Sequence, residues 1–193
     1  MYPYVRCLFC ETGYEERVIR LIEASDGCCG LFPRKIKRIF RAGKWTEELK
    51  ALLPGYVFLF SETETPVERL LQTEHVLRVL RYDGEPDGYL KGTDRELADM
   101  LLRQGGVVGV LEAVKIGSWI EITDGLLKQY HGKVVRMDRR KRMALIQLDI
   151  VGHANQVWLS YECIEPLANQ KEQTLSELSE AQASPEEIRQ RDE

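Results

Sequence analysis

Leu53-Pro54-Gly55-Tyr56-Val57-Phe58-Leu59-Phe60 is the stretch that decides the fold. Proline and glycine mark a turn at its start, because proline fixes its backbone and glycine tolerates a sharp turn. The aromatic and aliphatic run that follows predicts a buried strand. Side chains alternate along a strand, so Tyr56, Phe58 and Phe60 share one face and the two aliphatic residues between them share the other. Both faces are apolar, which leaves two alternatives: a central strand covered twice, or an aromatic face that meets a partner.

Length and composition limit the class of protein. The chain has 193 residues, of which 44% are hydrophobic, enough for one ordinary domain or two small ones. The formal net charge is −4, so nucleic acid would have to bind local basic patches. The sequence contains no apolar run of about 18 residues, and we expect neither a membrane span nor a signal peptide. Five cysteines at irregular spacing favour a reduced, cytoplasmic protein.

Residues 1–106 alternate between strand and helix patterns. Apolar runs predict strands near 5–10, 31–40, 56–60 and 76–82, and amphipathic segments predict helices from Tyr14 onward, over 66–74 and after Thr93. The strand over 31–40 is expected to run into a basic loop. Glu96 stands three residues after Thr93, which predicts a capping box. The order β-α-β-β-α-β-α predicts an α+β sandwich on an antiparallel-rich sheet.

The second half of the chain contains only strand patterns. Residues 107–116 are predicted as a linker. Short apolar runs at 119–123, 133–138, 143–151 and 156–160, separated by turn residues, predict a small all-β barrel over 117–167. Residues 168–193 are rich in Glu, Gln and Ser, which predicts a disordered acidic tail.

Two motifs in this order resemble the NusG family of transcription elongation factors, in which an NGN domain, a linker and a KOW barrel follow one another. Leu53-Pro54-Gly55-Tyr56-Val57 resembles the family's Phe-Pro-Gly-Tyr-Val signature, and Gly125-Leu126-Leu127-Lys128-Gln129-Tyr130-His131-Gly132-Lys133-Val134 resembles the KOW motif. The resemblance covers residues 4 to 167. Within the family, residues 8–13 and 138–142 are most similar to the LoaP group of specialised antiterminators. The chain departs from the family pattern at Val5-Arg6, where the family has Trp-Tyr, at Leu53, and at Leu126 and Gln129.

The resemblance implies binding to RNA polymerase through an apolar patch that grips the clamp coiled coil. The matching positions here are Phe9, Leu53, Tyr56 and Phe58. Aromatic residues on a rigid sheet face are the usual composition of an interface hot spot. From the residues alone a core role for Tyr56 and Phe58 is favoured, and the resemblance shifts the preference to a partner face. The implied activity is suppression of pausing and termination.

Two basic clusters suggest contact with nucleic acid. One lies in a stretch without an acidic residue and suggests contact with phosphates of upstream DNA, or else a solvated loop: Arg34, Lys35, Lys37, Arg38, Arg41 and Lys44. The other lies in the predicted barrel, where basic and aromatic residues suit RNA: Lys128, Tyr130, His131, Lys133, Arg136, Arg139, Arg140, Lys141 and Arg142. Charged hairpin tips are also common on ordinary proteins. The LoaP resemblance implies that the ligand is an RNA hairpin near the start of the transcript. Trp158 is expected to point outward as a packed edge residue.

No catalytic or metal-binding pattern accompanies these clusters. Cys7 and Cys10 are spaced like metal ligands, but residues three apart on a strand point to opposite faces. We therefore expect no enzymatic activity, cofactor or metal. We also expect the protein to be a monomer. Two alternatives remain open: a general elongation factor whose barrel binds a ribosomal protein or a termination factor, and a ribosome-associated or purely RNA-binding KOW protein.

Overall fold

The computed structural model of the chain describes residues 2–116, 119–122 and 133–164. Its elements are β1 (Tyr4–Cys10), α1 (Glu15–Glu23), β2 (Cys28–Leu31), β3 (Arg34–Arg41), β4 (Lys44–Ala51), β5 (Tyr56–Ser61), α2 (Val67–Leu71), β6 (Val76–Val79), α3 (Gly92–Arg103), β7 (Val107–Val108), β8 (Leu111–Ile116), β9 (Trp119–Ile122), β10 (Lys133–Asp138), β11 (Met143–Ile150) and β12 (His153–Ile164). None of the helices in these ranges combines the length and the apolar character that crossing a membrane requires.

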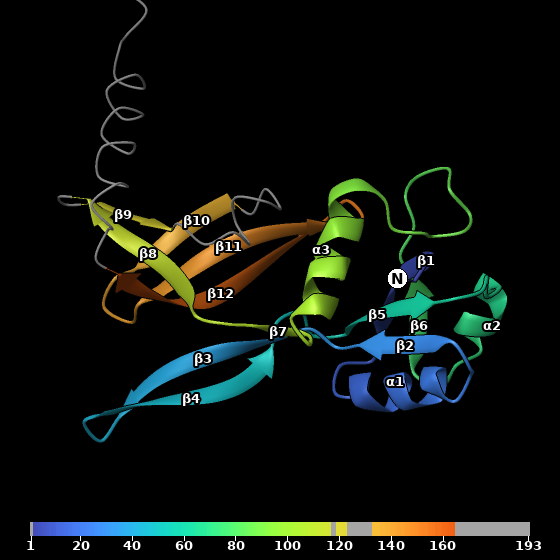
Figure 1. Cartoon of the computed structure of the whole chain (residues 1–193), viewed down its shortest axis with the longest axis horizontal. Helices are drawn as coiled ribbons and strands as arrows, with labels where there is room; N and C mark the ends of the chain where they lie inside the picture. Colours follow the sequence, from blue (N-terminus) through green and yellow to red (C-terminus); the bar gives the residue numbers. More distant parts are fainter. Residues whose placement is uncertain (1, 117–118, 123–132, 165–193) are drawn as a thin grey trace, which may run out of the picture.

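The aromatic and aliphatic run after Pro54-Gly55 forms β5, a central strand of a four-stranded sheet. The strands lie in the order β2-β5-β1-β6, and each neighbouring pair is antiparallel. Every residue of β5 is buried. Its aromatic face belongs to the same buried cluster as the apolar side of α3, and its aliphatic face belongs to a second cluster with residues of α1 and α2. Helices thus cover both faces of this sheet (Figure 1).

The expectation of an uncovered aromatic face is therefore wrong. Phe58 is 0% exposed and Tyr56 7%, and Leu53 in the preceding turn is equally inaccessible. The covering residues come from α3, where Leu97, Ala98, Met100 and Leu101 are buried. Of the two alternatives that the sequence left open for this strand, the central strand covered twice is the one observed.

The turn before β5 is tied to the start of α1. Gly55 has a φ of +81°, and a Cβ atom there would lie 2.9 Å from the carbonyl oxygen of Cys10. Glu15, whose side chain is buried, accepts hydrogen bonds from the backbone N–H of Gly55 at 2.8 Å and of Gly13 at 2.7 Å. Cys10 donates its N–H to the Gly55 carbonyl at 2.7 Å. These bonds fix the turn against β1 and the helix start.

Several elements differ from the sequence prediction. The predicted basic loop is a regular antiparallel hairpin of β3 and β4, which with β7 makes a three-stranded sheet. The predicted linker 107–116 contains β7 and most of it forms β8. Helix α2 is shorter than the predicted 66–74. The capping box at Thr93 is wrong, because α3 starts at Gly92 and has no side-chain cap.

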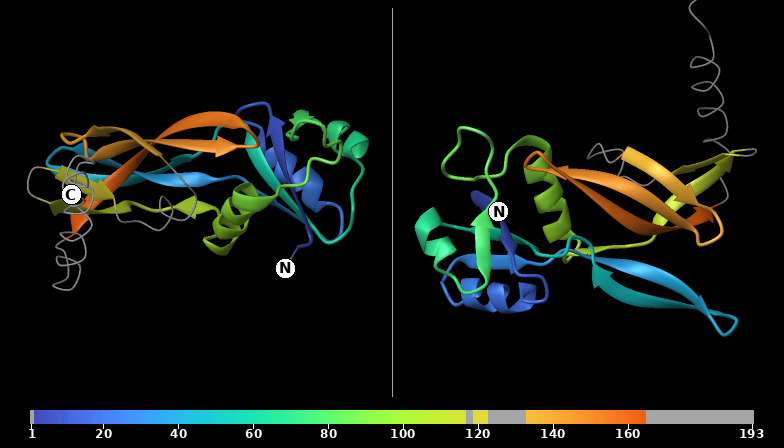
Figure 2. Two further views of the ribbon diagram at one scale, coloured as in Figure 1. Left: turned by 90° about the horizontal axis from the view of Figure 1, so that it is seen from above. Right: turned by 180° about the vertical axis from the view of Figure 1, so that it is seen from behind.

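The all-β part of the chain is a five-stranded sheet in the order β10-β11-β12-β8-β9. Neighbouring strands are antiparallel except β12 and β8, which run parallel. Figure 2 shows this sheet curving on one side of α3, with the four-stranded sheet on the other. The predicted fold class, an α+β unit followed by a small barrel-like all-β unit, is confirmed.

Helix α3 joins the two units. A single buried cluster includes residues of α3 and residues of β11 and β12. The carboxylate oxygen Oδ2 of Asp94 accepts a hydrogen bond from the Tyr82 hydroxyl at 2.6 Å and another from the Val151 N–H at 3.0 Å. Asp94 therefore connects the loop after β6 to the turn between β11 and β12.

The hydrogen bond between Tyr82 and Asp94 at this junction is expected to change the titration of Tyr82. Burial, followed by the hydrogen bond to Asp94, raises the pKa of Tyr82 to about 12. Because the neutral phenol is favoured in the folded protein, its contribution to stability is complete below the ordinary tyrosine pKa of about 10 and is lost as pH rises through about 12. We expect Asp94→Ala to lower this pKa, measured by NMR of ring-labelled tyrosine. Asp99→Ala, on the same helix, should leave it unchanged; an unchanged value in Asp94→Ala would contradict the assignment.

Candidate nucleic-acid interface

The β3–β4 hairpin carries the first basic cluster. The strands pair from Arg34 opposite Ala51 to Arg41 opposite Lys44, and the connecting residues Ala42 and Gly43 both have positive φ. Two such residues suit the right-handed twist of a tight hairpin. Because side chains alternate, Lys35, Lys37 and Arg41 lie on one face of β3 and Arg34 and Arg38 on the other.

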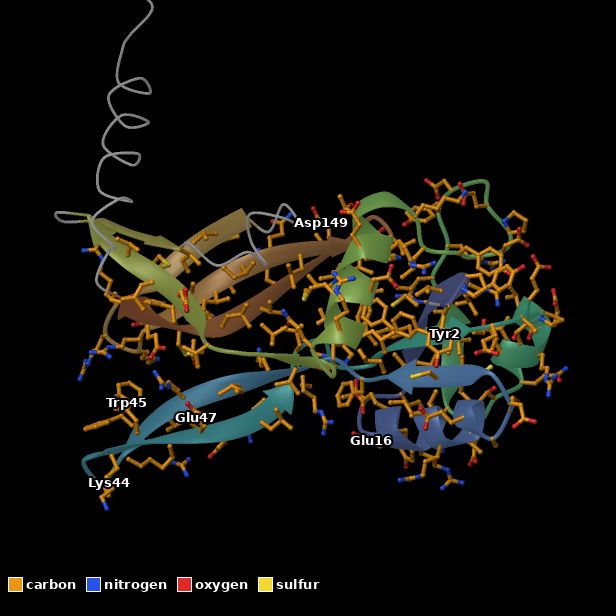
Figure 3. The ribbon with its side chains drawn as sticks, in the orientation of Figure 1. Tyr2, Glu16, Lys44, Trp45, Glu47 and Asp149 are labelled. Atoms are coloured by element: carbon orange, nitrogen blue, oxygen red, sulfur yellow. The ribbon has the colours of Figure 1, made fainter. Side chains whose placement is uncertain are left out.

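The hairpin projects away from the four-stranded sheet and runs beside the all-β unit (Figures 1 and 2). Arg38 anchors it there. Its backbone N–H donates to Ser160 Oγ at 3.0 Å, and its Nη1 lies 2.7 Å from Glu162 Oε2 on β12. Near the hairpin end, the Arg142 guanidinium lies 5.6 Å from the centre of the Trp45 ring. Figure 3 shows Trp45 on the side of the hairpin that faces the all-β unit, with Lys44 at its far end.

A groove of about 1190 Å³ lies between the hairpin and the all-β unit. We call it the composite groove, since both units line it. Its basic residues are Lys35, Lys37, Arg38, Arg41, Lys50, Arg140 and Lys141, and its single acidic residue is Asp138. Its large aromatic residues are Phe40, Trp45, Tyr56 and Trp158. The two basic clusters, about one hundred positions apart in the sequence, thus line the same groove.

Carboxylates neutralise only part of the positive charge of the composite groove. Arg38 is paired with Glu47 and Glu162, and Lys141 Nζ lies 3.8 Å from Asp138 Oδ2. Glu48, opposite Lys37 in the hairpin but not part of the groove lining, is shared between Lys50, at 3.0 Å, and Arg41, at 3.8 Å.

Three groove cations, Lys35, Lys37 and Arg140, form no ion pair among the residues that the structure describes. Burial, with a smaller effect from neighbouring Lys37, lowers the pKa of Lys35. The ammonium of Lys35 is thus held in an environment that disfavours its charge. An anion bound in the groove would relieve this cost.

The other predicted residues of the barrel cluster either lie off the groove or fall outside the described residues. Arg136 on β10 and Arg139 in the β10–β11 turn are exposed but do not line the groove. Lys128, Tyr130 and His131 fall outside the described residues, as does the side chain of Lys133. Of the hairpin cluster, Arg34 and Lys44 also lie off the groove. Arg34 lies 3.6 Å from Glu16 on α1.

The predicted polymerase patch is divided between core and surface. Phe9 is partly exposed; its ring meets the Tyr56 ring edge-on at 5.4 Å, and the Arg78 guanidinium lies 4.8 Å from its centre. Leu53 and Tyr56 reach the inner end of the composite groove, while Phe58 contacts only the interior.

The cysteines behave as small core residues at β1. Cys7 and Cys10 belong to the two different buried clusters, on opposite faces of the sheet as the spacing predicted. Burial raises the pKa of Cys10 to about 11 and that of Cys7 further. Within the described ranges, no three His, Cys, Asp or Glu side chains are grouped as a metal site would require.

No protein-family model and no curated protein match the chain. The chain is similar to solved structures. One describes domain interaction in Thermotoga maritima NusG, with 17% sequence identity and a TM-score of 0.48, over 81% of this chain and 93% of that one. Another is the MjSpt4:Spt5 complex, with 16% identity and a TM-score of 0.25, over 82% and 99% of the two chains. At these values the likeness transfers no function to this chain.

The composite groove itself was not predicted. The basic residues of the sequence included most of its cations, but Trp45 and Lys50 were not predicted, because β4 shows no strand periodicity. Trp158 was assigned to a packed edge, and it is partly buried in the groove wall. No local signal places β3 beside β12, since the hydrogen bond from Arg38 to Ser160 joins residues 122 positions apart.

Proposed function

We propose that this chain is a transcription elongation factor of the NusG type, which binds RNA polymerase and is recruited through nucleic acid held in the composite groove. The observation that carries the proposal is that four residues of the hairpin cluster and two of the barrel cluster, Arg140 and Lys141, line one groove with aromatic walls. A net charge of −4 offers no general attraction for nucleic acid, so this local field is the feature that suits it. The motifs at residues 53–57 and 125–134, in that order, add the resemblance to the family.

The proposed activity needs no covalent chemistry. A factor that binds the active, closed clamp of the polymerase more tightly than the paused state shifts the population toward elongation. Suppression of pausing and termination follows from that differential binding. A cytoplasmic, monomeric protein fits this activity.

Phe9 is the proposed centre of the polymerase contact, because it alone of the four predicted residues remains partly exposed. Leu53, Tyr56 and Phe58 would act from beneath, by fixing the Phe9 ring and the sheet that carries it. Next to Phe9, the edge strand β6 presents Arg78 and Leu77, the latter 53% exposed. An aromatic ring beside an arginine suits a protein interface.

Co-purification of native RNA polymerase with the full chain tests the proposal. We expect capture by the wild type and at least about tenfold weaker capture by Arg78→Glu, which reverses a charge beside Phe9 without opening the core. Arg20→Glu, on the exposed side of α1, is the matched control and should capture normally. A wild-type chain that binds nucleic acid but captures no polymerase would contradict the proposal and favour a purely RNA-binding protein.

A further inference from the structure

The composite groove has features that distinguish between paired and unpaired nucleic acid. Its walls carry aromatic rings from both units: Phe40 and Trp45 from the hairpin, with centroids 5.2 Å apart, and Trp158 from β12. Aromatic rings bind the faces of bases, and those faces are accessible only when the bases are unstacked. A duplex hides them and presents backbone and groove edges instead.

The cations of the groove are placed to follow one sugar-phosphate backbone. Lys35 and Lys37 are two residues apart on the same face of β3, and both line the groove. Arg140 approaches from the β10–β11 turn on the opposite wall. These are the three groove cations without an ion-pair partner in the described chain, and they are therefore free to meet phosphates.

The two walls are fixed relative to one another before any ligand arrives. Arg38 joins β3 to β12 through its backbone N–H and its guanidinium, and the Arg142–Trp45 contact joins the turn of β10–β11 to the hairpin end. A preformed site reduces the ordering cost of binding.

We infer that the composite groove binds an unpaired nucleic-acid strand, with phosphates at Lys35, Lys37 and Arg140 and a base stacked on Trp158. The inference rests on the proposed function and sharpens it: the ligand is a single strand, not a folded hairpin stem, and the first unit contributes two of the three phosphate contacts. Nascent RNA and an unpaired DNA strand share this chemistry.

Fluorescence anisotropy of the full chain tests the inference. The probes are a labelled, unstructured RNA of about 12 nucleotides, the DNA of the same sequence, and the duplex of each, measured across a salt series. We expect both single strands, or one of them, to bind at least about tenfold more tightly than the duplexes. Binding of only one strand would identify the source of the ligand. Equal or tighter duplex binding would overturn the inference.

Variants locate the ligand within the groove. Lys35→Gln with Lys37→Gln should lower the slope of log affinity against log salt by about 1.4, the value for two lost phosphate contacts on a single strand. Lys44→Gln, on the same hairpin but off the groove, should leave the slope unchanged. Trp158→Ala should weaken binding about 5- to 150-fold without changing the slope, and Trp158→Phe, which keeps a stacking ring, should restore most of it.

An unchanged slope in the double lysine variant, or an equal loss in Lys44→Gln, would overturn the inference in favour of a diffuse surface charge. Polymerase capture is measured on the same proteins. Capture by a wild-type chain that shows no preference for single strands would overturn this inference and leave the proposed function standing. A wild-type chain that prefers single strands but captures no polymerase would overturn the proposed function and leave this inference standing.

Discussion

Phe58→Ala is expected to lower the free energy of unfolding by about 3–5 kcal/mol. Phe58 is 0% exposed and lies in the middle of β5, between the neighbouring strands β1 and β2 and beneath α3. Removing its ring leaves a cavity, because the surrounding sheet and helix relax only in part. The loss would be a large fraction of the about 5–15 kcal/mol that a domain usually has. Urea unfolding followed by far-UV circular dichroism, with the wild-type slope as a check, measures it.

Phe40→Ala provides the matched control. It removes the same side chain from the hairpin, where Phe40 is 58% exposed, and we expect a change within about 1 kcal/mol. A stable Phe58→Ala protein that no longer captures polymerase would contradict the buried assignment and return this ring to a partner face.

The difference between the two phenylalanines shows what local sequence can reveal. The aromatic and aliphatic run identified β5, and strand alternation sorted its side chains correctly, because strand geometry is a local property. Whether the aromatic side faces a helix or solvent depends on α3, some forty residues later. The apolar stripe of α3 was also visible in the sequence, but the stripe does not say which sheet face it covers. Burial on a given face is therefore a property of tertiary packing.

The β3–β4 hairpin could not be predicted from the sequence for a different reason. Residues 44–51 mix charged and apolar residues without a clear period, since β4 is an edge strand exposed along most of its length. Its turn is Ala42-Gly43, which lacks the Asn-Gly or Asp-Gly signal of a tight hairpin. The cations could be found by composition, whereas the groove depends on contacts between β3 and β12 that are remote in the sequence.

Glu15→Ala is expected to lower the free energy of unfolding by about 1–3 kcal/mol, because it leaves the Gly55 N–H without a partner at a buried site, whereas the exposed Gly13 can donate to water. The carboxylate accepts from Gly55 N–H and Gly13 N–H, and only 4% of the residue is exposed. Glu16→Ala is the matched control. Glu16 is exposed and lies 3.6 Å from Arg34, so we expect its removal to change the free energy of unfolding by no more than about 0.5 kcal/mol.

Glu15→Gln separates the two hydrogen bonds from the volume of the side chain. The amide keeps the size of the carboxylate but has a single oxygen, so one backbone N–H keeps its acceptor and the other faces an NH₂ group. We expect a loss between those of Glu16→Ala and Glu15→Ala in the same urea measurement. A Glu15→Gln protein as stable as the wild type would show that one of the two bonds is unimportant.

The same variant links the turn to the proposed polymerase contact. A Cβ atom at Gly55 would lie 3.1 Å from the Phe9 ring, so the position of this turn sets the position of the ring. If Phe9 is the centre of the contact, Glu15→Gln should weaken polymerase capture while leaving single-strand binding intact, because the anchors of the composite groove at Arg38 and Arg142 are untouched. Equal loss of both activities would mean that the variant perturbs the whole fold, and unchanged capture by a destabilised variant would place the polymerase contact away from Phe9.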